Sequence, residues 1–328
     1  MRAPGFWSNP PARPGWQALA LAPLASIYAG ATARRVARPP EVTAGVPVIC
    51  VGNLTAGGTG KTPTVIALLE RLGAQAAHVV TRGYGGSAEG PLRVDERQHG
   101  AGEVGDEPLL LSAFAPVWVA KDRAAGVRAA EAAGAGVILL DDGLQNPAVA
   151  KTLSVVVVDA EVGFGNGRVI PAGPLREPVA AGMARADLVL TIGGAAAQER
   201  FGATWGGAVT VPRATAHLEV LRTGMDWAGL RVMAFAGIGR PEKFFATLRA
   251  EGAELLRAEA LDDHQPLSDA LMKRLEIEAA ALGAQLVTTE KDAVRLPSSF
   301  RQKVLTLPVR LRFDEAAALE TALGRLGL

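Results

Sequence analysis

The sequence predicts an α/β protein with a doubly wound, mostly parallel sheet and a second, smaller α/β domain. Apolar runs such as residues 46–51 and 136–140 alternate with stretches of helical periodicity. Strands that are so uniformly apolar are buried on both faces, which is typical of parallel sheets. Hydrophobic residues make up 49% and charged residues 20% of the 328 residues, a globular composition with enough chain for one large or two moderate domains.

The elements expected in the first domain follow one another from residue 46 to residue 194. Asp122 suits the N-cap of one helix, and Asp106 and Glu107 place negative charge at the start of another, where it favours the helix dipole. The expected strands cover residues 46–51, 76–83, 116–121, 136–143, 154–160 and 186–194, and the expected helices cover residues 61–72, 105–114 and 122–133.

The alternation loosens between residues 206 and 229 and then resumes in a smaller unit. Its expected strands cover residues 230–239, 284–292 and 304–313, and its helices cover 241–251, 268–282 and the C-terminus. The sequence therefore divides into three parts. These are an N-terminal apolar and basic segment at residues 1–40, a first α/β domain at residues 41–210, and a smaller C-terminal α/β domain at residues 211–328.

A glycine-rich segment, VGNLTAGGTGKTP at residues 51–63, joins the first expected strand to the first expected helix. Its glycines let backbone N–H groups bind phosphate oxygens, Lys61 can reach the β- and γ-phosphates, and the Thr62 hydroxyl can ligate Mg²⁺. Thr55 replaces the usual first glycine, which closes the turn and does not form the cradle. We therefore predict a P-loop NTPase-type fold that binds ATP. The expected nucleotide-binding residues are Thr55, Ala56, Gly57, Gly58, Thr59, Gly60, Lys61 and Thr62.

Two adjacent acids, Asp141 and Asp142, end the apolar run that begins at residue 137. An acid at the end of a buried strand forms the second half of such a nucleotide site, because one carboxylate can hold Mg²⁺ directly or through water. Paired acids also occur in solvated turns. The position of this strand after a phosphate-binding loop favours the metal-binding interpretation.

Two sequence features that are missing here disfavour two classes of nucleotide-binding protein. No N-K pair occurs, which disfavours guanine-nucleotide proteins, and Ala56 stands where dimeric partitioning ATPases carry lysine. A kinase remains, and it needs a base for its acceptor hydroxyl. Asp106 and His264 are candidates for a paired base. Helix capping by Asp106 and a structural role for His264 remain open at this point.

The segment at residues 1–40 carries five arginines and no acidic residue around an apolar run at residues 16–28. A signal peptide is disfavoured by the ATP-type loop that follows. A membrane-spanning helix needs about 20 apolar residues, and Gln17 and Pro23 interrupt this run. An interfacial helix whose arginines meet anionic headgroups and an ordinary core-packing helix both remain open.

Composition excludes several other classes. The formal net charge is only +1 and aromatic residues make up 5%, so nucleic acid is not an expected ligand. Cys50 is the single cysteine, which excludes a disulfide within the chain and fits a reducing compartment. Cys50 lies in an apolar run and is expected to be a buried strand residue. No protein partner is evident from the sequence.

Short motifs follow the glycine-rich loop in a characteristic order. They are TRGYGG, VGDEPLLL, KDR, LLDDGLQ, PAGPLREP, DDH and VTTEKDAVRL. With the loop, this ordered set resembles the tetraacyldisaccharide 4'-kinases, the lipid A 4'-kinases, over about residues 45–295, and the N-terminal helix also fits. The resemblance implies transfer of the γ-phosphoryl group of ATP to the 4'-hydroxyl of a lipid disaccharide 1-phosphate. The implied product is lipid IVA, made at the cytoplasmic face of the bacterial inner membrane.

The resemblance also implies roles for individual residues, with the second domain closing over the site. The implied catalytic residues are Asp106, paired with His264 across the domain cleft, Lys61 and Asp142. The implied Mg²⁺ ligands are Thr62, Asp141, Asp142 and Gln145. The implied phosphate and substrate contacts are Arg82, Arg123, Arg176 and Glu177. The family often has D-D-G-F-Q-H-R where this chain has Leu144 and Asn146-Pro147, so no role of that aromatic or histidine is carried over.

An acylated substrate adds weight to the interfacial interpretation of the N-terminal segment, because its acyl chains prefer the bilayer and its sugars stay at the interface. We therefore expect a membrane-associating helix within residues 1–40. Two other functions use the same nucleotide fold. One is an ATP-dependent metal or cofactor chaperone, and the other is a non-catalytic, membrane-associated ATP-binding module.

Overall fold

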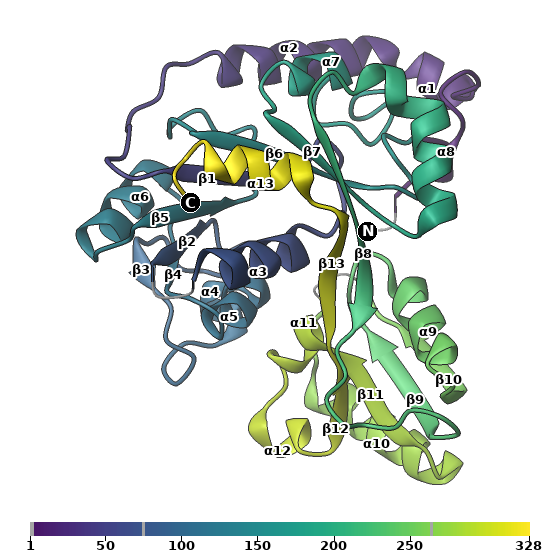
Figure 1. Ribbon diagram of the computed structural model, residues 1–328. Coiled ribbons are helices and arrows are strands. Elements are labelled where there is room, and N and C mark those ends of the chain that lie inside the picture. Colours follow the sequence, from purple (N-terminus) through teal and green to yellow (C-terminus); the bar gives the residue numbers. More distant parts are fainter. Residues whose placement is uncertain (1–2, 74–75, 263–264) are drawn as a thin grey trace.

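The computed structural model describes residues 3–73, 76–262 and 265–328, which form a large α/β layer structure and a smaller one below it (Figure 1). The large sheet has nine strands in the order β13-β8-β7-β6-β1-β5-β2-β4-β3. Neighbouring strands from β8 to β4 are parallel, and β13 and β3 are antiparallel additions at the two edges. The predicted doubly wound, mostly parallel sheet is therefore confirmed. Its strands are β1 (Val48–Gly52), β2 (Ala77–Thr81), β3 (Leu92–Arg93), β4 (Val117–Val119), β5 (Val137–Asp141), β6 (Leu153–Asp159), β7 (Leu188–Ile192), β8 (Arg213–Val220) and β13 (Val309–Glu315).

Helices cover both faces of this sheet because side chains alternate along each buried strand. Ile49 of β1 belongs to a core shared with α3, α5 and α13, whereas its neighbour Cys50 belongs to a core shared with α6, α8 and α2. Cys50 is fully buried, as predicted. Asp122 caps α6 by accepting a hydrogen bond from the Ala125 N–H. The helices around the sheet are α3 (Lys61–Leu72), α4 (Ala101–Val104), α5 (Asp106–Ser112), α6 (Arg123–Ala132), α7 (Val179–Met183), α8 (Ala195–Trp205) and α13 (Ala317–Gly324).

The smaller sheet has four parallel strands in the order β10-β9-β11-β12. It has two cores: Leu248 of α9 belongs to one and Phe235 of β9 to the other, which also includes Leu275 of α10. The strands are β9 (Arg231–Ala236), β10 (Glu254–Ala260), β11 (Gln285–Thr289) and β12 (Val304–Leu307). The helices are α9 (Pro241–Ala250), α10 (Asp269–Leu282), α11 (Glu290–Ala293) and α12 (Ser298–Arg301).

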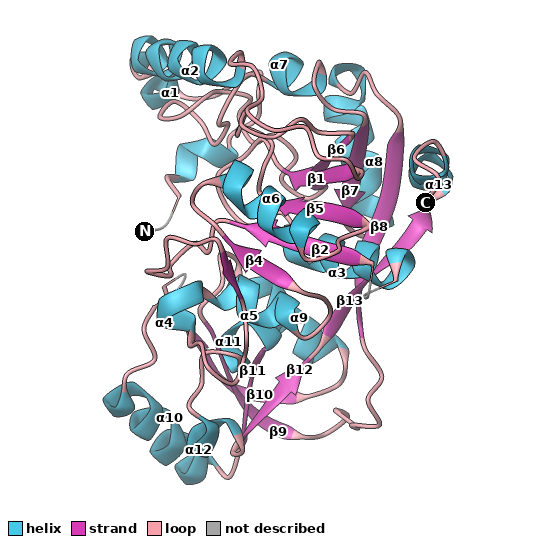
Figure 2. Cartoon of the chain, turned by 90° about the vertical axis from the view of Figure 1, so that its left-hand side faces the viewer, coloured by secondary structure: helices cyan, strands magenta, loops and turns pink. Residues whose placement is uncertain are grey.

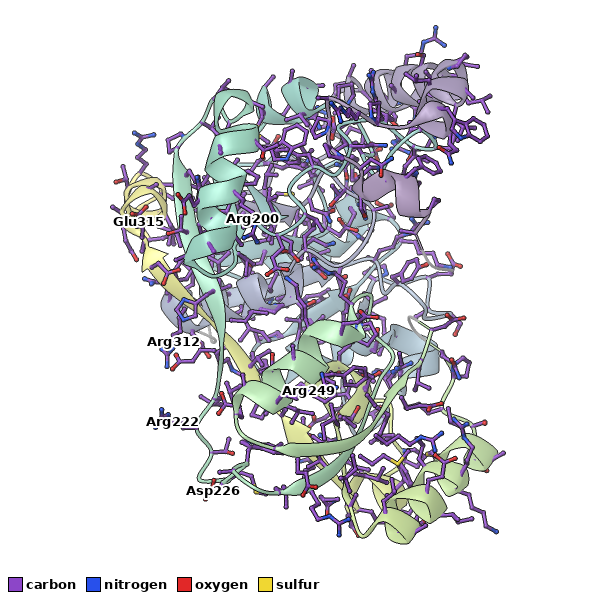
Figure 3. The ribbon with its side chains drawn as sticks, turned by 90° about the vertical axis from the view of Figure 1, so that its right-hand side faces the viewer. Arg200, Arg222, Asp226, Arg249, Arg312 and Glu315 are labelled. Atoms are coloured by element: carbon purple, nitrogen blue, oxygen red, sulfur yellow. The ribbon has the colours of Figure 1, made fainter. Side chains whose placement is uncertain are left out.

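Residues 304–313, expected as one strand, form two strands in different sheets, so that expectation was wrong. Pro308 separates them: it has no N–H for a ladder, and its carbonyl accepts from the Leu221 N–H. Beyond Pro308, β13 pairs with β8 and returns the chain to the large sheet. The chain thus passes between the sheets twice, along the ribbon of β8 and β13 seen in Figure 3. The domain limits at residues 210 and 211 remain a prediction.

The N-terminal segment forms η1 (Gly5–Ser8), α1 (Trp16–Ala20) and α2 (Ala22–Val36). Figure 2 shows α1 and α2 together at the end of the large layer that is remote from α10 and α12. Of the large apolar side chains in this segment, Trp16 is 74% and Ile27 is 70% exposed, whereas Ala25 and Thr32 are buried against the large domain. Among the helices of the described residues, none has the length and apolarity that crossing a membrane requires.

Candidate active site

The glycine-rich loop leaves the carboxyl end of β1, which lies between β5 and β6 at the centre of the sheet. Gly57 and Gly60 have φ angles of +114° and +94°, a region that favours glycine. A Cβ atom at Gly60 would also lie 2.6 Å from Cδ1 of Ile192. The backbone can therefore curl into the start of α3, where Lys61 is the first helical residue. This is the strand–loop–helix geometry of a phosphate-binding site.

Thr55 has a structural reason to replace the usual first glycine. It forms an antiparallel bridge with Leu175, and the flanking Ala56 N–H donates to the Pro174 carbonyl at 2.8 Å. The Arg176 N–H donates to the Leu54 carbonyl at 2.7 Å. The first half of the loop is thus bound to the segment that follows residue 173, and its φ at Thr55 is not positive.

Asn53, which the sequence analysis missed, fixes the second half of the loop. Its fully buried amide Nδ2 donates to Oγ1 of Thr59 at 3.1 Å and to the Gly57 carbonyl at 3.3 Å. Nε2 of Gln145 donates to the Asn53 carbonyl at 3.0 Å. The sequence signal that could have identified Asn53 is its position, since it is a polar residue directly between a buried strand and a glycine-rich loop. These side-chain hydrogen bonds therefore hold the conformation of the loop.

Asp142 forms ion pairs with two basic residues. Nη1 of Arg176 donates to its two carboxylate oxygens at 2.9 and 3.1 Å, and Nζ of Lys61 lies 3.8 Å from Oδ1. Burial acts to raise the pKa of Asp142, but Lys61 and Arg176 outweigh it and hold this pKa below its usual range. Asp142 also has a φ of +53°, the one positive value at a non-glycine residue in the described chain. Such strain is typical of a functional turn.

Asp141 lies in a different environment from its neighbour. It is 1% exposed, and burial together with the negative charge of Glu107 raises its pKa to about 7. Oγ1 of Thr81 donates to Oδ2 at 3.3 Å, whereas Oδ1 has no hydrogen-bond partner within the described residues. A buried carboxylate oxygen without a donor suits Mg²⁺, which binds proteins through one or two carboxylates plus substrate phosphates.

The other expected metal ligands contribute less directly. The side-chain amide of Gln145 already has hydrogen-bond partners. Its Nε2 donates to the Asn53 carbonyl and to Oε1 of Glu177, and its Oε1 accepts from Nη1 of Arg176. Across the described ranges there is no group of three or more His, Cys, Asp and Glu side chains that could hold a metal ion by itself. A metal at this position would therefore depend on the nucleotide phosphates, which is the usual arrangement for Mg²⁺.

Glu177 is a buried carboxylate that binds Gln145 and Arg185. Its side chain is 4% exposed and accepts from Nε2 of Gln145 at 2.9 Å. Nη2 of Arg185 donates to both of its carboxylate oxygens at 2.8 Å. In this position Glu177 orients Gln145, and through it the carbonyl of Asn53.

Arg82 and Arg123 both line the cavity that contains Lys61 and Asp142. Arg82 follows directly after β2, next to Thr81, and is exposed. Arg123 is 5% exposed, and its Nη1 donates to the Ala120 carbonyl at 2.6 Å. Burial lowers the pKa of Arg123 to about 10, against the opposing charges of Asp141 and Asp142. The guanidinium of Arg123 therefore keeps its positive charge at neutral pH.

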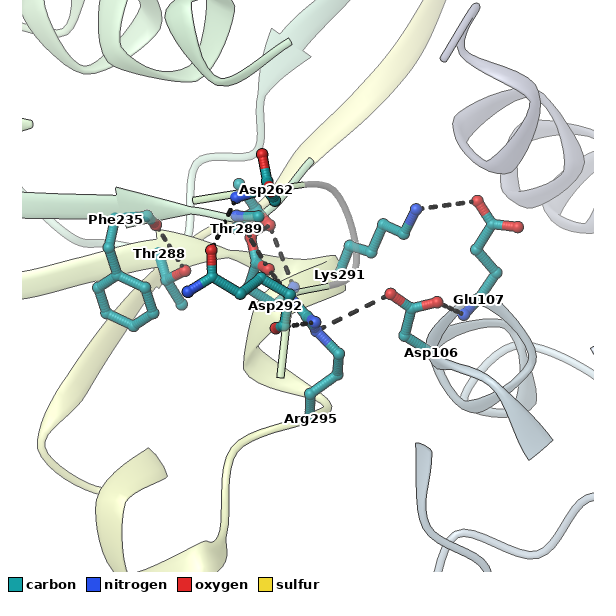
Figure 4. A network of polar contacts seen from close by, with 11 residues as sticks. Asp106, Glu107, Phe235, Asp262, Thr288, Thr289, Lys291, Asp292 and Arg295 are labelled. Atoms are coloured by element: carbon teal, nitrogen blue, oxygen red, sulfur yellow. Dashed lines mark hydrogen bonds and ion pairs between the residues drawn. The ribbon is translucent and has the colours of Figure 1, made fainter. Parts of the chain in front are cut away.

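Asp106 stands where the two layers of the molecule meet (Figure 4). It begins α5, is 3% exposed, and accepts the Glu107 N–H at 3.0 Å through Oδ1. From the small domain, Nε of Arg295 lies 3.8 Å from Oδ2 of Asp106, and Nζ of Lys291 lies 3.2 Å from Oε1 of Glu107. His264, the expected partner of Asp106, lies outside the described residues.

Many of these residues line a cavity of about 740 Å³. Its walls come from the glycine-rich loop, the ends of β2 and β5, the helix α2, and the small domain. Among the lining residues are Ala56, Gly57, Gly58, Lys61, Thr81, Arg82, Arg123, Asp141, Asp142, Gln145, Arg176, Glu107 and Lys291, together with Tyr28 and Arg35 of α2 and Gly239 of the small domain.

The model of the tetraacyldisaccharide-1-P 4'-kinase family, LpxK, matches residues 17–326 of this chain. The chain belongs to this family. The tetraacyldisaccharide 4'-kinase of Dinoroseobacter shibae is 66% identical over 99% of this chain and 98% of its own length. That of Jannaschia sp. is 60% identical over 99% of both chains. The family predicted from the ordered motifs is therefore confirmed, and so is the class of activity, a kinase.

The fold agrees with that of a solved tetraacyldisaccharide 4'-kinase. LpxK from Aquifex aeolicus, whose crystal structure contains ATP, superposes with a TM-score of 0.75 over 94% of this chain and 99% of that chain. The two sequences are 24% identical, so this likeness concerns the fold. A member of the family with the same architecture thus binds ATP.

Proposed function

We propose that this tetraacyldisaccharide 4'-kinase transfers the γ-phosphoryl group of ATP to the 4'-hydroxyl of a tetraacyldisaccharide 1-phosphate and so makes lipid IVA in lipid A biosynthesis. Relatives that are up to 66% identical over nearly the whole chain are tetraacyldisaccharide 4'-kinases. The observation that carries the residue roles is the cavity itself, which joins Lys61 and Asp142 of the phosphate-binding side to the helix α2.

The phosphate-binding side positions ATP. The N–H groups of the loop hold the phosphates, and Lys61, with its ammonium 3.8 Å from Asp142, neutralises charge that develops on the transferred group. Arg123 adds a second, buried positive charge. Thr62 and Asp141 would hold Mg²⁺, with Asp142 beside them. When bound, Mg²⁺ neutralises charge on the β- and γ-phosphates.

Asp106 and His264 together accept the proton of the acceptor hydroxyl. A buried carboxylate at the start of α5, beside cations of the small domain, can orient an imidazole and stabilise its protonated form. Asp106 belongs to the large layer, and His264 to the segment between β10 and α10. Closure of the small domain over the cavity would then bring the base to the reacting hydroxyl.

The N-terminal helices bring the cavity to the membrane. Trp16, Leu19, Leu24 and Ile27 are between 55% and 74% exposed on α1 and α2. Buried in a bilayer surface, these side chains provide apolar area, and Arg34 and Arg38 can meet anionic headgroups. Catalysis at the cytoplasmic face of the inner membrane would give the protein access to both ATP and an acylated acceptor.

The test uses γ-labelled ATP and a tetraacyldisaccharide 1-phosphate in detergent micelles. Transfer of label to the lipid is the expected result. ATP hydrolysis without labelled lipid would instead favour an ATP-dependent metal or cofactor chaperone. Binding of ATP without turnover would favour a non-catalytic, membrane-associated module, and either outcome would overturn the proposal.

A further inference from the structure

The segment TTEKDAVRL at residues 288–296 belongs to the small domain and lies against the large one (Figure 4). At its centre is Asp292, which is fully buried. The carboxylate of Asp292 accepts the Gly237 N–H at 3.1 and 3.2 Å and the Thr289 hydroxyl at 2.7 Å. It also forms an ion pair with Arg295. Since three donors hold this buried carboxylate, the arginine that it binds is held in place as well.

The guanidinium of Arg295 has contacts in three directions, and its side chain is only 10% exposed. Nη2 donates to Asp292, and Nη1 donates to the Gln265 carbonyl at 2.9 Å. Nε lies 3.8 Å from Oδ2 of Asp106 and has no hydrogen-bond partner among the described residues. Because a guanidinium is planar, the two bonds made within the small domain fix the direction of the remaining N–H.

These contacts connect Arg295 to both halves of the proposed base. Gln265 directly follows His264 in the sequence, so Arg295 binds the backbone next to the residue that carries the imidazole. Asp106 begins α5 of the large domain and faces Arg295 across the junction (Figure 4). One side chain of the small domain thus reaches the neighbourhood of both groups.

The separation of 3.8 Å between Nε and Oδ2 is short of a hydrogen bond. A charge-assisted N–H···O bond has an N···O distance of about 2.8 Å, so an approach of about 1 Å would form one. A buried donor without a partner is costly, and closure of the small domain that gives it a carboxylate is therefore favourable. The geometry fits a contact that is completed when the two domains close.

Given the proposed function, on which this step rests, we propose that Arg295 is the positioning residue of the Asp106–His264 base. Held by Asp292, it orients the carboxylate of Asp106. Through Gln265 it also sets the segment that carries His264 against that carboxylate as the small domain closes. Arg295 acts through the pair and not on a substrate, so its loss lowers kcat and leaves the KM values unchanged.

The experiment measures transfer of label from ATP to the tetraacyldisaccharide 1-phosphate by Arg295→Lys in detergent micelles. Lysine keeps a positive charge beside the buried Asp292, which protects the fold, but one ammonium cannot replace the planar fork. The kcat is expected to fall roughly ten- to hundredfold, as for loss of a hydrogen bond to a charged group. The KM values for ATP and for the lipid are expected to stay within about twofold of wild type.

A double variant separates positioning from a structural role. If Arg295 acts through Asp106, Asp106→Asn combined with Arg295→Lys has the kcat of Asp106→Asn alone, because the group that Arg295 orients no longer functions. A further loss in the double variant, as large as the loss that Arg295→Lys causes in wild type, would show that the two residues act independently. That result would overturn the proposal.

The matched control is Arg240→Lys, the same substitution at another arginine that joins the small domain to the large one. Arg240 pairs with Asp159, and Nζ of Lys243 lies 2.7 Å from the same carboxylate, so the kcat should stay near wild type. An equal loss of kcat in Arg240→Lys would mean that Arg295 only holds the domains together, and would overturn its positioning role. A wild-type kcat in Arg295→Lys would overturn that role alone. Failure of the wild-type protein to label lipid would overturn the proposed function, and the positioning role with it.

Discussion

The two ends of the catalytic cavity are built in different ways. At the end that we propose binds ATP, the loop is fixed by buried hydrogen bonds of Asn53 and Gln145 and by backbone hydrogen bonds to the segment from Pro174 to Arg176. At the other end, which we propose receives the acceptor, Tyr28 and Arg35 line the cavity from the largely exposed helix α2. The contrast follows from the ligands. Phosphoryl transfer requires charges that are fixed in advance, whereas a lipid must enter from a membrane surface.

This comparison predicts different kinetic effects at the two ends. Substitutions at the donor end, and at the base between the ends, should lower kcat, because they remove interactions that act in the transition state. Substitutions at the acceptor end should raise the KM for lipid or weaken vesicle binding. The predictions below are ordered from the largest expected effect to the smallest.

Asp106→Asn is expected to lower kcat by roughly 10²–10⁴-fold, the contribution typical of a general base. The dissociation constant for ATP, measured by calorimetry, should stay within about twofold, since Asp106 lies outside the glycine-rich loop. The control is Glu103→Gln on the neighbouring helix α4, an exposed acid that does not line the cavity. Equal kcat values for Asp106→Asn and wild type would remove Asp106 from the proton transfer.

Lys61→Ala is expected to lower kcat by roughly 10²–10³-fold, because a positive charge directed at the transferred group is lost. Its affinity for ATP should weaken as well, in contrast to that of Asp106→Asn. Lys273→Ala, at an exposed position of α10, removes the same charge far from the cavity and should behave as wild type. A rate for Lys61→Ala near that of Lys273→Ala would contradict the loop assignment.

Replacing Trp16, Leu19 and Ile27 together by serine is expected to weaken binding to anionic vesicles about tenfold or more, since each buried apolar side chain contributes to partition. These side chains are 74%, 59% and 70% exposed, so the fold should be unaffected. With lipid dispersed in detergent, kcat should remain unchanged. Ile277→Ser, at a 59% exposed position of α10, is the control. Unaltered vesicle binding of the triple variant would exclude α1 and α2 as the membrane contact.

Asp141→Asn probes stability and should change the melting temperature by a few degrees. The folded pKa of Asp141 is raised to about 7 from an ordinary 3.8, so this carboxyl contributes stability below pH 4 that is lost as the pH rises to about 7. Asparagine lacks this dependence. In protein free of nucleotide and metal, the variant should therefore gain stability relative to wild type between pH 4 and pH 7. A constant difference across this range would contradict the raised pKa.

Local patterns in the sequence predicted most of the secondary structure around the glycine-rich loop. Uniformly apolar runs identified β1, β5 and β6, Asp122 was predicted as a helix cap, and the glycine-rich loop located Lys61. These features depend on residues that are close in sequence, where periodicity and capping are reliable signals. The predicted buried strands, and the predicted order of strand, glycine-rich loop and helix, were therefore confirmed.

Features that depend on distant pairing were not predicted. The strand β13 was not separated from β12, because its partner β8 is about ninety positions away and only Pro308 marks the break. The strand β10 lies at a sheet edge with mostly exposed side chains, so it has no apolar run. The same limit applies to the site. The link from Arg185 through Glu177 to Gln145 and Asn53 joins segments that only the fold brings together.

The position of the new phosphate on the product tests the account most directly. A tetraacyldisaccharide 1-phosphate is incubated with the protein and ATP, and the lipid product is examined by ³¹P NMR and mass spectrometry. The account predicts two separate phosphomonoesters, the original one at position 1 and a new one at position 4'. A diphosphate at position 1, or unmodified lipid beside hydrolysed ATP, would contradict it.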